Sequence, residues 1–304
     1  MRALVVTPDA PGRLRLTEVP DPSPKPDECL IRVAATSLNR GEVNQIARAS
    51  AGTILGWDAA GIVLQPAAQG GPAAGSRVVT SGSNGGWAEL RAVNIQDLAV
   101  LPENIDIGAA ATLPIAGVTA LRALRIAGNL LGRRVLITGA SGGVGRFAVQ
   151  LAHHAGAYVI AIVGSEARGT GLAALGANEV LTSIDAVTIP VFAVIENVGG
   201  QMLAAAFSVL EVGGSLISIG AASAQPTTFP PYSTVGPHRS LISFTTRGEG
   251  GPLGRDLAYL VNLLHTGSLD PQIAWRGSWE RATEAVQLLL DRKINGKAVL
   301  DIPN

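Results

Sequence analysis

The sequence predicts an α/β protein of two domains, in which a β-rich domain precedes a doubly wound parallel sheet. Three observations predict this fold. Residues 133–156 read as a strand, a glycine-rich turn and a helix. Short apolar runs broken by Gly, Pro and Asn fill the chain to about residue 112, and strands alternating with helical stretches follow. After residue 250 the chain returns through two helical stretches to a last strand.

The β-rich part is expected to contain only short strands joined by irregular loops. Two stretches, residues 20–26 and 65–76, are rich in Pro, Ala and Gly, which is typical of surface loops, and we assign them no function. The strands are predicted at residues 3–6, 28–34, 61–64, 77–80 and 87–93.

The alternating part is expected to form a six-stranded doubly wound sheet, because βαβ units build parallel sheets. Its strands are predicted at residues 134–138, 158–163, 179–181, 191–195, 215–219 and 241–246, with helices at 143–154, 169–175 and 200–210. In the tail we predict helices at residues 253–265 and 278–292, a short segment at 270–275 and a strand at 298–302.

The glycine-rich turn after the first of these six strands is the main candidate for ligand binding. Few side chains at the bend let a phosphate approach the backbone N–H groups, and the positive end of the helix dipole faces that phosphate. The context of strand, turn and helix predicts dinucleotide binding, against the alternative of a turn shaped by packing alone. Ser141 is interpreted as part of this turn, because the Asp and His partners of a hydrolase serine are missing. The turn reads Gly139-Ala-Ser141-Gly142-Gly143-Val144-Gly145.

Composition excludes several other classes of function. The formal net charge is zero and lysine occurs only at positions 25, 293 and 297, so we expect no basic surface for nucleic acid. The single cysteine, Cys29, excludes an internal disulfide and a cysteine-cluster metal site. The N-terminus reads as a strand and not as a signal peptide, and apolar runs such as residues 155–163 are too short for a bilayer. We therefore expect a cytoplasmic protein without a membrane partner.

Five motifs follow one another along essentially the whole chain. They are Ser37-Leu-Asn39-Arg-Gly-Glu42, Gly56-Trp-Asp-Ala-Ala-Gly61, residues 113–124 (LPIAGVTALRAL), residues 139–150 and Gly296-Lys297-Ala-Val-Leu300. In this order they resemble the zinc-independent medium-chain dehydrogenase/reductases, in the quinone oxidoreductase or ζ-crystallin-like branch. The resemblance implies a GroES-like catalytic domain at residues 1–112 and 249–304 and a Rossmann cofactor-binding domain at 113–248, with NADPH in the cleft between them.

Zinc is not expected, although related alcohol dehydrogenases use it to polarise a carbonyl group. In those enzymes the metal ligands are a cysteine, a histidine and a second cysteine. The matching positions of this sequence are Asn39, Trp57 and Ile115, which do not make a zinc site. The cysteine-rich lobe that holds a structural zinc is also missing.

The residues after the second strand of the doubly wound sheet favour NADPH over NADH. Sites specific for NAD place an Asp or Glu there to bind the adenosine ribose, but this sequence has Gly164 and Ser165, followed by Arg168. A small residue makes room for a 2′-phosphate, and an arginine and a hydroxyl can bind it. Two alternatives stay open, in which Glu166 reaches the ribose or Arg168 is only a solvated residue at a helix start.

Other cofactor contacts are expected mainly at strand ends. Asn197 follows the fourth strand and Gly220 the fifth, and Phe244 and Thr245 lie at the end of the sixth, at the edge where such sheets bind ligands. The resemblance further implies that Thr119 contacts the cofactor and that Lys297 reaches its adenosine end. Each of these residues has the alternative of a turn or packing role.

Hydride transfer needs proximity, exclusion of water and a donor for the developing oxyanion, but no nucleophilic side chain. We predict that the amide of Asn39 donates to the oxyanion, that Arg40 supplies positive charge, that Glu42 orients a neighbour and that Trp57 lines the pocket. The alternatives are a turn cap for Asn39, a solvated Arg40 and a core position for Trp57. Residues 44–55 contain no tyrosine, which disfavours a tyrosine proton donor.

The sequence hypothesis is thus a zinc-free, NADPH-dependent reductase of a quinone or an α,β-unsaturated carbonyl compound. One alternative is a medium-chain enoyl-thioester reductase, and another is an NADP(H)-binding sensor or structural protein with little turnover. A homodimer through the edge strand at residues 241–246 is expected, because an uncovered apolar edge tends to pair with its symmetry mate.

Overall fold

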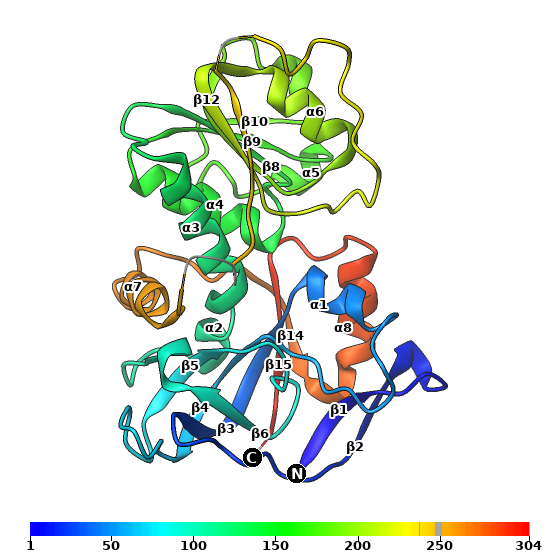
Figure 1. The fold of residues 1–304 in the computed structure, drawn as a ribbon, viewed down its shortest axis with the longest axis vertical. Helices are drawn as coiled ribbons and strands as arrows, with labels where there is room; N and C mark the ends of the chain where they lie inside the picture. Colours follow the sequence, from blue (N-terminus) through cyan, green and yellow to red (C-terminus); the bar gives the residue numbers. More distant parts are fainter. Residues whose placement is uncertain (237, 247–250, 304) are drawn as a thin grey trace. The chain divides into compact units, whose positions relative to one another are not determined.

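The computed structural model describes residues 1–236, 238–246 and 251–303, and it confirms the predicted α/β fold. The chain divides into two compact units, shown in Figure 1: a first unit of Met1–Val118 and Gly251–Asn304, and a second unit of Thr119–Gly250. The first boundary follows Val118, whereas we expected it after residue 112. The expected second boundary, after residue 248, lies outside the described residues.

The first unit is built on a seven-stranded sheet to which both ends of the chain contribute. The last strand pairs antiparallel with the long third strand, with Leu300 opposite Thr36, and so completes a sheet that begins at the other end of the chain. The sheet order is β14-β15-β3-β4-β5-β7, with β6 also paired to β3. The strands are β3 (Glu28–Leu38), β4 (Asp58–Gln65), β5 (Arg77–Ser81), β6 (Leu90–Asn94), β7 (Leu98–Val100), β14 (Ile273–Ser278) and β15 (Lys297–Asp301), beside a hairpin of β1 (Arg2–Val6) and β2 (Leu14–Glu18).

Short helices cover the core of this unit. Figure 1 shows α1 (Arg40–Gln45) beside α8 (Ala282–Leu290), and the two pack together over Trp87 and Trp279, which are fully buried. The sequence analysis did not predict α1, β2 or β7, which are six, five and three residues long. The remaining helical segments are η1 (Pro11–Arg13), η2 (Ile95–Asp97), α2 (Ile107–Ala110), η3 (Leu113–Gly117), α7 (Gly254–His265) and η5 (Trp279–Arg281).

The second unit is the predicted doubly wound sheet. All six strands are parallel, in the order β10-β9-β8-β11-β12-β13, so the chain reverses direction across the sheet between β8 and β11. The strands are β8 (Arg134–Thr138), β9 (Tyr158–Ile162), β10 (Glu179–Leu181), β11 (Val191–Glu196), β12 (Leu210–Ser218) and β13 (Ser240–Ser243). They alternate with α3 (Val118–Ala127), α4 (Gly143–His154), α5 (Glu166–Gly169), η4 (Ile184–Ala186) and α6 (Gly200–Ser208).

The predicted helix at residues 169–175 is wrong. The helix α5 ends at Gly169, and turns follow up to residue 176. Gly171 and Gly176 have φ angles of +83° and +104°, a left-handed conformation that an α-helix cannot contain. Gly171 therefore interrupts the predicted helix, and Gly176 ends the turns that follow.

The expectation that every apolar run is too short to span a bilayer is wrong for one helical stretch. Among the described residues, Ile107–Ala127 is long and apolar enough by length and composition, with a mean hydropathy of 1.5. It comprises α2, η3 and α3. Of its apolar window, 89% is buried inside the fold, as in the core helix of a soluble protein, so the stretch is weak evidence for a membrane segment.

A cluster of polar side chains is buried where β3, β4 and β15 of the first unit meet α1. Glu42 and Asp58 are fully buried, and Lys297 and Asn39 are 2% and 8% exposed. The Lys297 Nζ donates to Asn39 Oδ1 at 2.6 Å and to the Leu38 carbonyl at 3.0 Å, and it lies 3.4 Å from Asp58 Oδ2. The Asn39 Nδ2 donates to Asp58 Oδ2 at 2.7 Å and to Glu42 Oε1 at 3.1 Å. We call these four residues the buried polar cluster.

The electrostatics of this cluster centre on Glu42. Its Oε2 accepts the Trp57 N–H at 2.7 Å, and its Oε1 accepts the Asn39 N–H at 2.7 Å. Burial, and then the nearby Asp58 carboxylate, raise the pKa of Glu42 from 4.5 to about 8. Burial also lowers the pKa of Lys297, against the attraction of the two carboxylates. With two acids and one base, the fully ionised cluster carries an uncompensated negative charge, which a proton on Glu42 removes.

We expect the free energy of unfolding to fall as the pH rises from about 5 to about 8, because native Glu42 keeps a proton that the unfolded chain, with a pKa of 4.5, has released. One proton gives a slope of at most about 1.4 kcal/mol per pH unit. Urea unfolding at several pH values measures this contribution as the difference between the wild type and Glu42→Gln, which should decrease with pH.

The same substitution at Glu89 is the control. Burial raises the pKa of Glu89, but hydrogen bonds from Arg2 outweigh it and lower the pKa below 4.5. Glu89 is therefore ionised in both states across the window, and the Glu89→Gln profile should run parallel to the wild type. A parallel profile for Glu42→Gln would contradict the raised pKa.

Candidate functional site

The predicted cofactor residues of the second unit gather at one edge of its sheet. Because all six strands are parallel, their carboxyl ends meet at the same edge, where such sheets bind ligands. Residues 139–145 follow β8, Gly164, Ser165 and Arg168 follow β9, Asn197 follows β11, Gly220 follows β12, and Phe244 and Thr245 follow β13.

Residues 139–145, which we call the diphosphate turn, have the geometry of an anion cradle. Gly142 is the N-cap residue of α4 and has no side-chain cap, so the first N–H groups of the helix are left for a ligand. A Cβ on Gly145 would lie 2.5 Å from the Gly139 carbonyl oxygen, closer than any side chain allows. Only glycine permits this approach of helix to strand, and the residues present fit a diphosphate.

The structure brings Arg168 to the diphosphate turn. Its Nε donates to Ser141 Oγ at 3.1 Å, across 27 residues of sequence. Gly164 is exposed, and a Cβ built there would meet nothing within 4 Å, so there is open space beside the strand end. Ser165 and Glu166 are exposed as well. The arrangement fits a 2′-phosphate, which needs space and a guanidinium group.

Sequence reasoning missed Arg146, which is 7% exposed. It lies in the first turn of α4, and its Nη2 donates to the Thr170 carbonyl at 3.0 Å while its Nε lies 3.4 Å from the Ser141 carbonyl. It thus joins the diphosphate turn to the segment after α5. Nothing in the sequence distinguishes this buried arginine from a solvated one.

Sequence reasoning also missed Glu196, because we ended the fourth strand at residue 195. Glu196 is fully buried at the carboxyl end of β11. It accepts hydrogen bonds from Thr138 Oγ1 and from the N–H groups of Val198 and Gly199. Burial raises the pKa of Glu196, although these hydrogen bonds oppose the shift. A carboxylate directly after an apolar strand was the available signal.

Thr119 lies with the residues that follow β13. Its hydroxyl is hydrogen-bonded to the hydroxyl of Thr246, and Arg122 donates to the Thr246 carbonyl at 2.9 Å. Thr246 follows the predicted residues Phe244 and Thr245, of which Phe244 is half-buried and Thr245 exposed. The structure therefore groups Thr119 with this strand end.

In the first unit, the structure does not support the predicted role of Asn39. Both hydrogens of its amide are donated, one to Asp58 and one to Glu42, and its oxygen accepts from Lys297. An amide in this state cannot donate to a substrate oxyanion without breaking a buried hydrogen bond. Glu42 does orient its neighbours as predicted, since it accepts the N–H groups of Asn39 and Trp57.

The other two predicted catalytic residues, Arg40 and Trp57, differ in what their side chains contact. Arg40 donates through Nη2 to the Leu289 carbonyl in α8 at 2.6 Å, so its guanidinium helps to attach α1 to α8. Trp57 is half-buried, and a Cβ on Gly41 would lie 2.7 Å from its ring, so the indole covers the start of α1. Of the two, Trp57 keeps an accessible apolar surface.

Lys297 requires a correction. The resemblance implied contact with the adenosine end of the cofactor, but the ammonium group is held inside the first unit by Asn39, Asp58 and the Leu38 carbonyl. It is almost fully buried. We assign Lys297 to the buried polar cluster, where it is the counter-charge of the two carboxylates.

Zinc does not fit the residues that are present. Trp57 and Ile115 offer no side-chain ligand, Ile115 uses its N–H to bind Asp58 Oδ1 at 3.0 Å, and the Asn39 oxygen faces the Lys297 ammonium. Within residues 1–236, 238–246 and 251–303, no three His, Cys, Asp or Glu side chains are grouped so that they could hold a metal ion.

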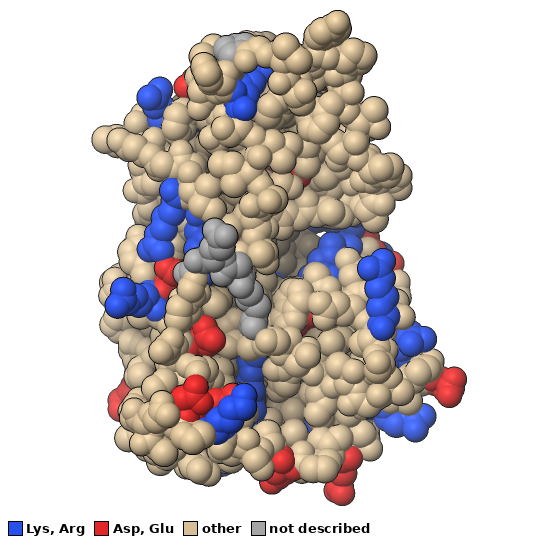
Figure 2. All heavy atoms as spheres, in the orientation of Figure 1, with Lys and Arg blue, Asp and Glu red and all other residues tan. Residues whose placement is uncertain are grey.

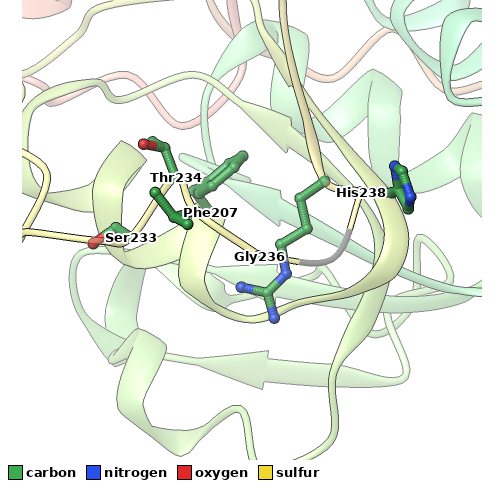
Figure 3. Close-up of a pocket in the computed structure, with 7 residues that line it drawn as sticks. Phe207, Ser233, Thr234, Gly236 and His238 are labelled. Atoms are coloured by element: carbon green, nitrogen blue, oxygen red, sulfur yellow. The ribbon is translucent and has the colours of Figure 1, made fainter.

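A small cavity of about 130 Å³ lies elsewhere in the second unit, where the chain approaches the amino end of β13. Figure 3 shows Phe207, Ser233 and Thr234 on one side of it and His238 on the other. It contains no predicted site residue. On the face drawn in Figure 2, basic side chains are scattered and interspersed with acidic ones, without one large basic surface.

Two families match the chain. Residues 25–103 match the alcohol dehydrogenase GroES-like domain, and residues 143–265 match the zinc-binding dehydrogenase family.

Similar proteins of known sequence include a chloroplast envelope quinone oxidoreductase homolog from Arabidopsis thaliana. It is 30% identical, with 95% of this chain and 94% of the relative covered. Acryloyl-coenzyme A reductase from Sulfurisphaera tokodaii is 26% identical, with 99% of each covered. The highly reducing polyketide synthase apmlA from Arthrinium phaeospermum is 30% identical over 81% of this chain, but the chain spans only 11% of that protein.

Several solved structures have a similar fold. A quinone oxidoreductase from Coxiella burnetii has a TM-score of 0.86 at 27% identity, with 100% of this chain and 99% of that chain covered. Mycobacterial Rv1454c complexed with NADPH has a TM-score of 0.89 at 25% identity, with 99% and 100% covered. An NAD-dependent alcohol dehydrogenase has a TM-score of 0.88 at 26% identity, with 100% of each covered.

These similarities agree with the five sequence motifs and with the two-unit fold. The chain is therefore an oxidoreductase that belongs to the medium-chain dehydrogenase/reductase superfamily, in its quinone oxidoreductase branch.

Proposed function

We propose that this protein is a zinc-free, NADPH-dependent oxidoreductase that transfers a hydride to a quinone or an α,β-unsaturated carbonyl compound. The observation that carries the choice of cofactor is the contact of Arg168 with Ser141 beside the open space at Gly164. A carboxylate at that strand end would repel a 2′-phosphate, whereas a guanidinium attracts it.

The cofactor, when bound, supplies the hydride. The residues of this chain hold it: the diphosphate turn receives the diphosphate, Arg168 and Ser165 receive the 2′-phosphate, and the strand ends at Asn197, Gly220 and Thr245 contact the remainder. Trp57 offers an apolar face for a flat acceptor. Asn39 and Glu42 keep the loop around Trp57 in place, since their polar atoms are occupied within the buried polar cluster.

Similar proteins support two candidate substrate classes. The quinone oxidoreductase homolog of Arabidopsis thaliana favours a quinone acceptor. The acryloyl-coenzyme A reductase of Sulfurisphaera tokodaii favours the second candidate, an enoyl-thioester reductase. Both reactions add a hydride to a conjugated acceptor.

The test of the proposed function measures NADPH oxidation by the purified protein with quinones, simple enones and enoyl-coenzyme A thioesters. Turnover with quinones or enones supports the proposal, and a strong preference for the thioesters supports the second candidate. Tight NADPH binding without oxidation of any of these would instead identify a sensor or structural protein.

Cofactor preference should depend on Arg168. We expect Arg168→Gln to raise the Kd for NADPH by about tenfold to a hundredfold, because one charge-assisted hydrogen bond to phosphate is lost. The Kd for NADH should change little. Quenching of intrinsic tryptophan fluorescence measures both constants.

Glu166→Gln, two residues away, is the matched control and should leave the preference for NADPH unchanged. If Glu166→Gln alters NADH binding while Arg168→Gln leaves NADPH binding intact, Glu166 binds the ribose and the proposed specificity is incorrect.

Turnover should survive metal removal. We expect prolonged treatment with a strong chelator to leave kcat and KM unchanged, because the residues at positions 39, 57 and 115 do not fit zinc. Elemental analysis of the untreated protein should show less than one zinc per chain. Loss of activity that returns on adding zinc would disprove the metal-free proposal.

We further propose a homodimer through β13, the edge strand of the second unit's sheet, where Leu241 is 45% exposed. Leu241→Lys should shift the protein to a monomer in light scattering coupled to gel filtration. Leu131→Lys is the control, since Leu131 is 74% exposed but precedes β8. A dimer that persists in Leu241→Lys would exclude this interface.

A cytoplasmic location, and the lack of nucleic-acid and membrane partners, stay predictions from the sequence.

A further inference from the structure

Glu196 is a buried carboxylate for which the proposed function has no use. Within the described parts of the chain, none of its hydrogen-bond partners is a Lys, Arg or His side chain, and no neighbouring charge contributes to the shift of its pKa. Its partners are neutral donors: Thr138 Oγ1 at 2.9 Å and Val198 N at 2.8 Å to Oε1, and Gly199 N at 3.0 Å to each oxygen. Burying a charge is costly unless hydrogen bonds replace its water; here they offset part of that cost, while burial still raises the pKa of Glu196.

These hydrogen bonds join two neighbouring turns. The Thr138 hydroxyl donates to Glu196 and accepts the Asn197 N–H at 3.0 Å. The Asn197 side chain returns a hydrogen bond from Nδ2 to the Thr138 carbonyl at 2.8 Å. Thr138 is the last residue of β8 and directly precedes Gly139 of the diphosphate turn. The network therefore attaches residues 197–199, which we call the β11 turn, to the start of the diphosphate turn.

The β11 turn in turn supports the segment after β12. The carbonyl oxygens of Asn197 and Val198 accept the N–H groups of Ala222 at 3.2 Å and Ser223 at 2.7 Å. A Cβ on Gly220 would lie 2.8 Å from the Asn197 carbonyl oxygen, so the two segments are in close contact. The turns after β8, β11 and β12, which are neighbouring strands of the sheet, thus share one hydrogen-bonded network, and Glu196 lies inside it.

The Glu196 carboxylate also limits which backbone N–H groups of the β11 turn can bind a ligand. It occupies the N–H groups of Val198 and Gly199, which would otherwise be available to an anion. In the neighbouring diphosphate turn, no side chain caps the start of α4. A Cβ on Gly139 would lie 3.3 Å from both Asn197 Cβ and Val198 Cγ2, so the β11 turn serves as a wall against which the diphosphate turn packs.

We propose that Glu196 is a positioning residue for cofactor binding, which acts through Thr138 to hold the β11 turn against the diphosphate turn. Glu196 does not touch the dinucleotide in this account; it keeps two turns in the relative position that the dinucleotide requires. The inference rests on the proposed function, because it concerns the same cofactor site.

The test uses the full-length protein and measures the Kd for NADPH by fluorescence. In Glu196→Gln the amide oxygen can replace Oε1, but the NH2 at the Oε2 position then faces the Gly199 N–H. The β11 turn should loosen and the Kd should rise about tenfold, which corresponds to about 1.4 kcal/mol. Thr138→Val removes the same link and should have a similar effect, whereas Thr138→Ser keeps the hydroxyl and should bind like the wild type.

Two further measurements separate positioning from general stability. Hydrogen exchange at the Val198 and Gly199 amides should accelerate in Glu196→Gln. This measurement requires neither enzyme activity nor a bound ligand. Ile195→Val is the stability control, because Ile195 is a fully buried neighbour with no part in the network. It should lower Tm through the lost methylene and leave the Kd unchanged. If Glu196→Gln does not fold, the two Thr138 variants carry the test.

Unchanged NADPH binding in Glu196→Gln and Thr138→Val, with normal binding by the wild type, would overturn this inference alone. Equal weakening in Thr138→Ser or Ile195→Val would do the same, because the effect would then come from stability. If the wild type binds neither dinucleotide, the proposed function fails and this inference fails with it.

Discussion

The parallel order of six strands is the constraint on which the candidate cofactor site depends. Strands that all run one way place all their carboxyl ends at one edge, so turns that are 27 to 59 residues apart in sequence become neighbours. The contact between Arg168 and Ser141 and the link between Thr138 and Asn197 both follow from this geometry. A ligand that extends along the edge can then contact turns from several strands at once.

Hydrogen-bond saturation is the corresponding constraint in the first unit. The polar atoms of Asn39, Glu42 and Asp58 are used by one another, by Lys297 and by backbone N–H groups. Such a network keeps the loop that carries Trp57 in one conformation, but it leaves these side chains little capacity to act on a substrate. The proposed hydride transfer would therefore depend on cofactor position and on exclusion of water more than on these side chains.

Much of the fold could be predicted from local pattern, and the errors have physical causes. The strand, turn and helix at residues 134–154 were predicted to the residue, because β-branched spacing, glycines and helical spacing all agree there. The helix predicted at residues 169–175 failed where Gly171 and Gly176 adopt left-handed angles. Arg146 and Glu196 escaped notice because burial of a charged side chain depends on partners from other elements, which local spacing does not encode.

The sequence by itself determined the family and the fold class, and it predicts the chemistry: a glycine turn for a diphosphate, a small residue and an arginine after the second strand of the doubly wound sheet, and no zinc ligands at positions 39, 57 and 115. Only the tertiary structure decided what the polar side chains do. Lys297 and Asn39 are 258 residues apart, yet they form one hydrogen bond that removes the amide from catalysis and the lysine from the cofactor. Residue type and spacing specify a single element, whereas the partner of a buried polar group is chosen when distant elements pack and water is excluded.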